Sequence, residues 1–185
     1  IKPATAARGR VRYAQLPEVA PHTGPASVFM SHCWGSIWGD FVMAACSGAY
    51  EGRFVWVDQF AVRARERGHA RALYLTARHP PVRQWPGNGA DMDFRGVIRG
   101  CTAVMVAAPV VEGKLTAGFM GLPDDRAAFL ASDEGKAAMR MLFVFRVWCV
   151  VELHSALEFG VSIVIRAGKA ARDGDAVTYD TRGAS

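Results

Sequence analysis

Several features that define other protein classes are missing from this sequence. No apolar run approaches the roughly 20 residues of a membrane-spanning helix. The longest apolar runs, Ala103–Val111 and Met141–Phe145, are typical of core segments. There is no internal repeat, no low-complexity tract and no Walker phosphate-binding loop. We therefore expect a protein that has no contact with membranes and no P-loop chemistry.

Metal-binding and disulfide patterns are also missing. The four cysteines form no C-x-x-C pair, and the five histidines lack the spacing of zinc ligands. Three cysteines lie in apolar surroundings, which indicates reduced thiols and an intracellular, cytoplasmic protein. We expect no structural metal and no bound cofactor. The sequence begins at Ile1 without a leader, so we expect it to be a fragment of a longer chain.

Charge is present in modest excess. The 185 residues carry 22 Lys and Arg against 17 Asp and Glu, a formal net charge of +5, and this length suits one domain. The balance fits an anionic small molecule and is too small to predict a nucleic-acid partner. The arginine-rich segment Ala61–Arg78 fits either a solvated face, which we favour, or a phosphate-binding patch.

Short apolar segments alternate with helical patterns along the chain. Residues 1–26 are expected to form a proline-rich N-terminal arm with a short helix around Arg10–Leu16, followed by one domain over residues 27–185. Buried strands are expected at residues 27–31, 54–58, 101–107 and 161–165. This alternation predicts an α/β fold, a flavodoxin-like doubly wound sheet of four to five parallel strands. Residues 176–179 are a further candidate edge strand.

Helical spacing marks the segments between these strands. Helices are expected at Trp38–Ala49, Asp91–Arg99, Asp125–Ala131 with Asp124 as cap, and Lys136–Phe159. Met141–Phe145 either continues or interrupts the last helix, and residues 110–140 form a long insertion before it. In doubly wound sheets, ligands bind beyond the carboxyl ends of the strands, which points to Ser31–Gly35 and Asp58–Phe60.

The chain is organised around the helix expected at Val147–Phe159. Its apolar face is expected to contain Val147, Val150, Val151 and Leu157. Residues three and four apart share a helix face, so Glu152 should lie beside Trp148, Cys149, Ser155 and Ala156. A carboxylate among small side chains, one turn after an indole, predicts a notch. The alternative is an ordinary surface glutamate, which the apolar neighbours Val151 and Leu153 disfavour.

Three segments together resemble the Toll/interleukin receptor (TIR) domain. They are Val28–Gly35, with its Ser-His-Cys-Trp-Gly ending, Val55–Asp58, and Trp148–Leu153 with the sequence Trp-Cys-Val-Val-Glu-Leu. Their order and approximate spacing are similar to those of the family over residues 27–166. Two departures concern the site: His32-Cys33 stands where the family often has an aromatic residue and Arg, and the insertion at 110–140 is unusually long.

The resemblance implies that Glu152 is catalytic in cleaving NAD between nicotinamide and ribose. Nicotinamide and ADP-ribose, or a cyclic ADP-ribose, would be the products, in a signalling or immune pathway. The expected substrate-binding residues are Ser31, His32, Trp34, Asp58 and Trp148. The aspartate would also orient the following loop, Gln59–Arg63. Family members assemble through TIR–TIR contacts, so self-association is expected too.

Two other functions compete with this one. A TIR-like scaffold that self-associates for signalling would carry an idle Glu152. A flavodoxin-like phosphoacceptor using Asp58 needs an acidic cluster around Mg²⁺, and Ser31-His32 supplies no acid. Cys149 as a nucleophile is disfavoured because no histidine pairs with it recognisably, which leaves it as small core filler.

Overall fold

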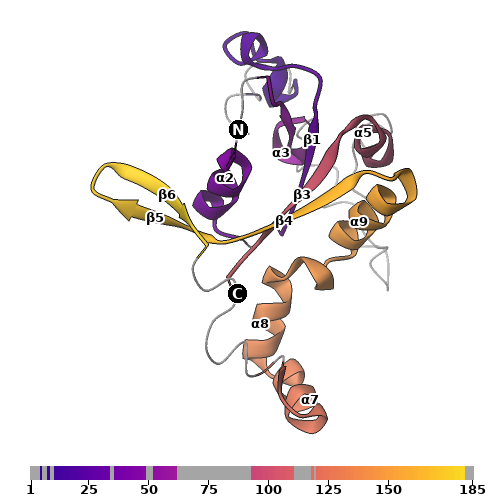
Figure 1. Cartoon of the computed structure of the whole chain (residues 1–185), viewed down its shortest axis with the longest axis vertical. Helices are drawn as coiled ribbons and strands as arrows, with labels where there is room; N and C mark the ends of the chain where they lie inside the picture. Colours follow the sequence, from indigo (N-terminus) through magenta and orange to yellow (C-terminus); the bar gives the residue numbers. More distant parts are fainter. Residues whose placement is uncertain are drawn as a thin grey trace.

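The computed structural model describes residues 5, 8, 11–33, 36–48, 52–61, 93–110, 118 and 120–181, apart from the side chains of residues 59 and 173. A sheet of four parallel strands, in the order β2-β1-β3-β4, forms its centre (Figure 1). The strands are β1 (Val28–His32), β2 (Val55–Trp56), β3 (Ala103–Ala108) and β4 (Ser162–Ala167). Helices flank this sheet, so the predicted flavodoxin-like α/β fold is confirmed.

The two faces of the sheet bury separate cores. Val28 and Met30 of β1 point into a core shared with α2 (Trp38–Cys46). Phe29, between them, points into a core shared with α5 (Phe94–Gly100) and α9. Successive side chains of a strand alternate between faces, and both faces of β1 are buried, which explains its unbroken apolar run.

The second strand is shorter than predicted. β2 contains only two residues, and Asp58 begins helix α3 (Asp58–Ala61) instead of ending the strand. A carboxylate in the first turn of a helix is favoured by the helix dipole. The loop expected at Gln59–Arg63 is therefore helical as far as Ala61. The arginine-rich segment beyond it lies outside the described residues, apart from its first residue.

Helix α9 (Val147–Phe159) meets the sheet through a different face from the predicted one. The predicted apolar face is exposed to solvent, with relative exposures of 71% for Val147, 47% for Val150, 43% for Val151 and 72% for Leu157. The buried residues are Cys149, Ser155 and Ala156. Small side chains let the helix approach the strands closely. Because the helix is apolar on nearly all sides, its apolar pattern could not define the buried face.

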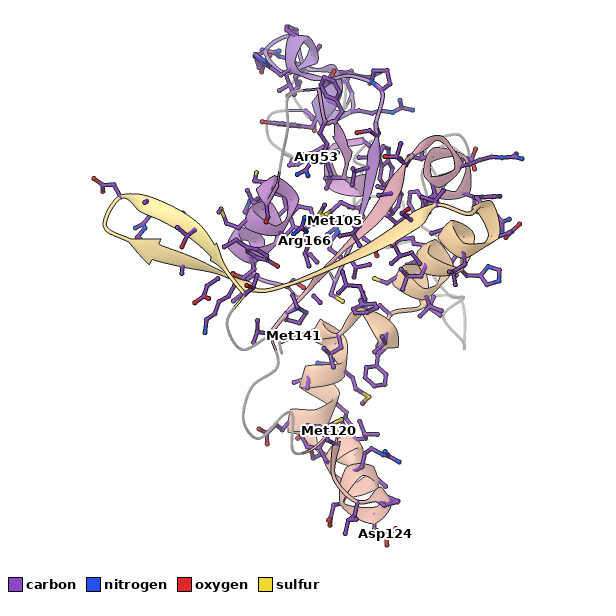
Figure 2. The ribbon with its side chains drawn as sticks, viewed as in Figure 1. Arg53, Met105, Met120, Asp124, Met141 and Arg166 are labelled. Atoms are coloured by element: carbon purple, nitrogen blue, oxygen red, sulfur yellow. The ribbon has the colours of Figure 1, made fainter. Side chains whose placement is uncertain are left out.

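The described part of the insertion before α9 contains two helices that project away from the sheet (Figure 1). Its helices are α7 (Pro123–Ala131) and α8 (Asp133–Met141), followed by the short 3-10 helix η4 (Phe143–Phe145). The stretch at Met141–Phe145 therefore interrupts the long helical pattern. Figure 2 shows Asp124 at the outer end of this projecting part and Met141 at the end nearer the sheet, with Met120 between them.

The corner between α7 and α8 has a cap that the sequence analysis missed. The hydroxyl oxygen of Ser132 accepts a hydrogen bond from the backbone N–H of Gly135 at 3.0 Å, which starts α8. Asp124, predicted as the cap of α7, lies in the first turn of that helix, and Leu122 occupies the cap position.

After β4 the chain forms a hairpin, β5 (Lys169–Asp173) and β6 (Ala176–Asp180), which is a separate antiparallel sheet. The strand predicted at 176–179 exists, but it pairs with β5 and not with the main sheet. The carboxylate of Asp40 on α2 accepts a hydrogen bond from the backbone N–H of Ala170 at 2.6 Å. This bond fastens the hairpin to α2.

The described part of the N-terminal arm contains two 3-10 helices, η1 (Tyr13–Gln15) and η2 (Ala20–His22). The short helix expected around Arg10–Leu16 is thus a single 3-10 turn. Leu16 is 1% exposed, and the Tyr13 ring lies 5.3 Å from the Phe60 ring of α3. These contacts join the arm to the end of the sheet where β2 leads into α3.

Candidate functional site

The end of β1 and the first turns of α9 meet at the carboxyl edge of the sheet. The Ser31 side chain, two residues after Phe29 on the strand, points to the same face, toward α9. Cys149 and Glu152, three residues apart, share one side of the helix. The sulfur of Cys149 lies 3.5 Å from the backbone oxygen of His32, which places the helix against the end of the strand.

Glu152 is a largely buried acid without an ion-pair partner among the described residues. Burial raises its pKa to about 8; the Ser31 hydroxyl opposes this shift, whereas Cys149 and Asp58 add to it. Its Oε2 atom is buried and has no hydrogen-bond partner. Unpaired acids of this kind concentrate at functional sites because a stable fold gains nothing from them.

Ser31 is the nearest polar neighbour of that acid. Its side chain is 1% exposed, and its hydroxyl oxygen also has no hydrogen-bond partner. The hydroxyl is close enough to oppose the rise in the Glu152 pKa, yet the two groups form no hydrogen bond of normal geometry. Each unsatisfied buried group costs about 1–3 kcal/mol. A ligand hydroxyl that bonded to both would remove this cost.

His32 is the last residue of β1, and its side chain points to the face of the sheet opposite to Ser31. Asp58 lies just after β2, at the start of α3. The imidazole packs against the Phe41 ring of α2, with ring centroids 4.6 Å apart. Burial lowers the pKa of His32, and the Asp58 carboxylate partly offsets that shift. The same carboxylate raises the pKa of Glu152. Asp58 thus acts electrostatically on both groups, while His32 faces away from Glu152.

Of the two predicted tryptophans, the structure describes only Trp148; Trp34 lies outside the described residues. Trp148 is 48% exposed, and its ring meets the Phe94 ring of α5 edge-to-face, at 6.1 Å and 79°. One indole face is therefore positioned by α5 while much of the ring remains open to solvent, one helical turn from Glu152.

A pair of thiols, which the sequence analysis missed, completes the site. Cys33 follows the last residue of β1, and its thiol interacts electrostatically with that of Cys149 on α9. The Cys33 thiol, the Ser31 hydroxyl and the Arg146 guanidinium together lower the pKa of Cys149 to about 7, against the effect of burial. The pKa of Cys33 is raised, chiefly by its interaction with Cys149. No spacing signal exists for two cysteines so far apart in sequence.

A cavity of about 500 Å³ lies beyond the carboxyl ends of β3 and β4, on the α2 side. Its walls come from α2, the segment after β3, the β5–β6 hairpin and Met141 of α8. Neither Ser31 nor Glu152 lines it. The cavity and the acid are therefore separate features of the same edge of the sheet.

Within the described residues, neither a metal-ligand cluster nor a membrane-spanning helix is present. Within them, no cluster of three or more His, Cys, Asp or Glu side chains could hold a metal ion. In the same part of the chain, no helix combines the length and the apolar character needed to cross a bilayer.

Comparison with known proteins gives no relative from which to assign this site. No family model, no curated protein and no solved structure matches the chain. The chemistry of Glu152 and its neighbours is therefore the guide to function.

Proposed function

We propose that the protein is a TIR-type NAD glycohydrolase in which Glu152 is the catalytic residue. One observation carries the proposal: a buried, unpaired carboxyl group lies beside the orphaned Ser31 hydroxyl at the carboxyl edge of a parallel sheet. The TIR-like motifs in the sequence supply the choice of substrate. The products would be nicotinamide and ADP-ribose or a cyclic ADP-ribose, released in a cytoplasmic signalling or immune response.

A single carboxylate is sufficient for this reaction. Nicotinamide leaves a cationic pyridinium as a neutral molecule, so no second carboxyl group is needed as a general acid, unlike in ordinary glycoside hydrolysis. Positive charge develops on the ribose as the bond breaks. A carboxylate in a site with little water stabilises that charge strongly, because the opposing dielectric screening is low.

The raised pKa of Glu152 suits a cationic substrate. The free acid is mostly protonated at pH 7, since its pKa is about 8. A positively charged nicotinamide ring beside it favours the ionised form. The acid would therefore acquire its charge when the substrate arrives. This arrangement avoids an unpaired charge in the empty site.

The neighbouring residues have separate proposed roles. Ser31 would hydrogen-bond a ribose hydroxyl together with Glu152, and the open face of Trp148 would contact the nicotinamide ring, adding about 0.5–2 kcal/mol of cation–π attraction. Asp58 would add negative potential. His32 and Trp34 remain proposed substrate contacts, the former through its backbone or through movement of its ring.

The direct test is incubation of the purified chain with NAD. We expect nicotinamide and ADP-ribose, or its cyclic form, to accumulate in proportion to protein concentration, as measured by chromatography. TIR enzymes often need assembly to order the site, so the assay includes a crowding agent. No nicotinamide at high protein concentration with crowding would remove the enzymatic proposal.

The activity should depend on pH through Glu152. If the carboxylate must be ionised, kcat/KM for nicotinamide release rises about tenfold between pH 7 and pH 9 and levels off near pH 9, because the pKa of Glu152 in the free protein is about 8. Initial rates at subsaturating NAD measure this profile. A rate that is constant from pH 6 to pH 9 would contradict a catalytic Glu152 carboxylate.

A non-catalytic, self-associating scaffold is the second candidate function. The exposed apolar side chains of η4 and α9 favour it: Val144 is 54% exposed, Phe145 47%, Val147 71% and Leu157 72%. Such a patch typically marks an interaction surface. Light scattering over a range of protein concentrations tests this reading, because a strictly monomeric chain would weaken it.

A further inference from the structure

The thiol pair at the end of β1 suggests chemistry beyond the proposed hydrolysis. Cys33 and Cys149 interact electrostatically with each other and are 1% and 3% exposed. The Cys149 sulfur also lies 3.5 Å from the carbonyl oxygen of His32, which belongs to the peptide bond joining His32 to Cys33. Two elements distant in sequence thus place the Cys149 sulfur beside the backbone that carries Cys33.

The surroundings of the pair make its two members unequal. The Cys33 thiol, the Ser31 hydroxyl and the Arg146 guanidinium lie near Cys149 and together lower its pKa to about 7. The interaction with Cys149 in turn raises the pKa of Cys33. One thiol that ionises easily beside one that retains its proton is the arrangement of an attacking and a resolving cysteine.

We propose that Cys33 and Cys149 form a peroxide-sensitive dithiol, in which oxidation closes a disulfide between the end of β1 and α9. The Cys149 thiolate attacks one oxygen of hydrogen peroxide and becomes a sulfenic acid, and hydroxide leaves. The Cys33 thiol then attacks the Cys149 sulfur, and the hydroxyl group leaves as water. Overall, two thiols and one peroxide give one disulfide and two waters.

Hydrogen peroxide is chosen as the oxidant because both sulfurs are nearly buried. It is only slightly larger than water, whereas a bulky disulfide reagent would have to open the site. The modification does not depend on the hydrolase activity. It links the strand that carries Ser31 to the helix that carries Glu152.

The other two cysteines provide internal controls. Cys46 is exposed and Cys101 is buried. Cys101 caps the end of α5, just before β3, and donates a hydrogen bond to the backbone oxygen of Ala26 at 3.6 Å. Burial raises its pKa. Burial alone therefore predicts that Cys33, Cys101 and Cys149 react alike, whereas the dithiol proposal predicts reaction at only two of them.

The experiment uses a Cys46→Ser background, because Cys33 and Cys46 lie on one tryptic peptide, residues 13–53. The folded protein is treated with about one equivalent of hydrogen peroxide, and remaining thiols are alkylated under denaturing conditions. Before alkylation, the oxidised protein should be about 2 Da lighter, and a dithiol reductant should reverse this loss; after alkylation, it should carry one alkyl group instead of three. The cross-linked peptides should be 13–53 and 147–166, with Cys101 alkylated.

Two further variants define the order of events. Cys33→Ser in the same background should leave a sulfenic acid on Cys149 that a cyclic 1,3-dione traps, with no cross-link. Cys101→Ser should leave the cross-link unchanged. Circular dichroism confirms that each variant is folded. Oxidation of Cys101 as fast as Cys149, or no cross-link between the two peptides after full consumption of peroxide, would overturn the proposal.

Discussion

Replacement of Glu152 by glutamine is expected to lower kcat for nicotinamide release by about 10²–10³-fold. Glutamine has nearly the same shape, so the substrate would still bind, but no negative charge would face the ribose as its bond to nicotinamide breaks. An interaction made mainly in the transition state affects kcat more than KM. Steady-state rates of nicotinamide release, measured at pH 9 where the wild-type acid is ionised, give the size of the loss.

The matched control is Glu158→Gln on the same helix. The Glu158 carboxylate accepts a hydrogen bond from the Arg95 guanidinium at 2.7 Å, and its side chain is 42% exposed. Removing a surface pair of this kind changes stability by about 0.2–1 kcal/mol and should leave kcat within about twofold of wild type. If Glu152→Gln and Glu158→Gln kept equal activity, Glu152 would have no catalytic role. If both lost it equally, the loss would reflect the helix and not the acid.

The strands β1 and β3 could be predicted from sequence because their environment is uniform. Both faces of β1 and β3 are buried, so apolar residues follow one another without alternating with polar ones, as in Val28–Met30. Such a run identifies a buried strand without knowledge of the rest of the fold. The position of Glu152 beside small residues followed in the same way from helical spacing. The strands are predicted from the apolar run that burial on both faces produces. The neighbours of Glu152 are predicted from residues within one helical turn.

Other features depend on contacts between distant residues, and the sequence pattern contains no trace of them. Which side of α9 is buried is decided by how closely the helix can approach the strands, and small residues allow the closest contact. The pairing of Cys33 with Cys149 requires the strand and the helix to be placed first. The hairpin after β4 pairs with itself because Gly168 permits a close approach: a Cβ there would lie 2.6 Å from the Tyr179 ring.

The same Glu152→Gln variant should be more stable than wild type at high pH. The pKa of Glu152 is raised from 4.5 to about 8 in the folded protein. An unfolded chain releases that proton near pH 4.5, whereas the folded chain keeps it until about pH 8. Between these values the unfolded state binds fewer protons, so the stability of the wild type falls as pH rises. The full penalty is present above pH 8 and reaches up to about 5 kcal/mol.

Glutamine carries no such proton, so the stability difference between Glu152→Gln and wild type should be small at pH 5, grow toward pH 8 and then stay constant. Urea unfolding at pH 5 and pH 9 measures it, and a gain of a few kcal/mol would raise the Tm by about 10 °C.

The control is Glu158→Gln, whose stability difference from wild type should not grow in this way, because the Glu158 side chain is substantially exposed. Loss of activity together with this gain would indicate that the fold tolerates an unfavourable acid for catalysis. A stability difference that did not change with pH would mean that Glu152 is solvated, and the proposed mechanism would lose its electrostatic basis.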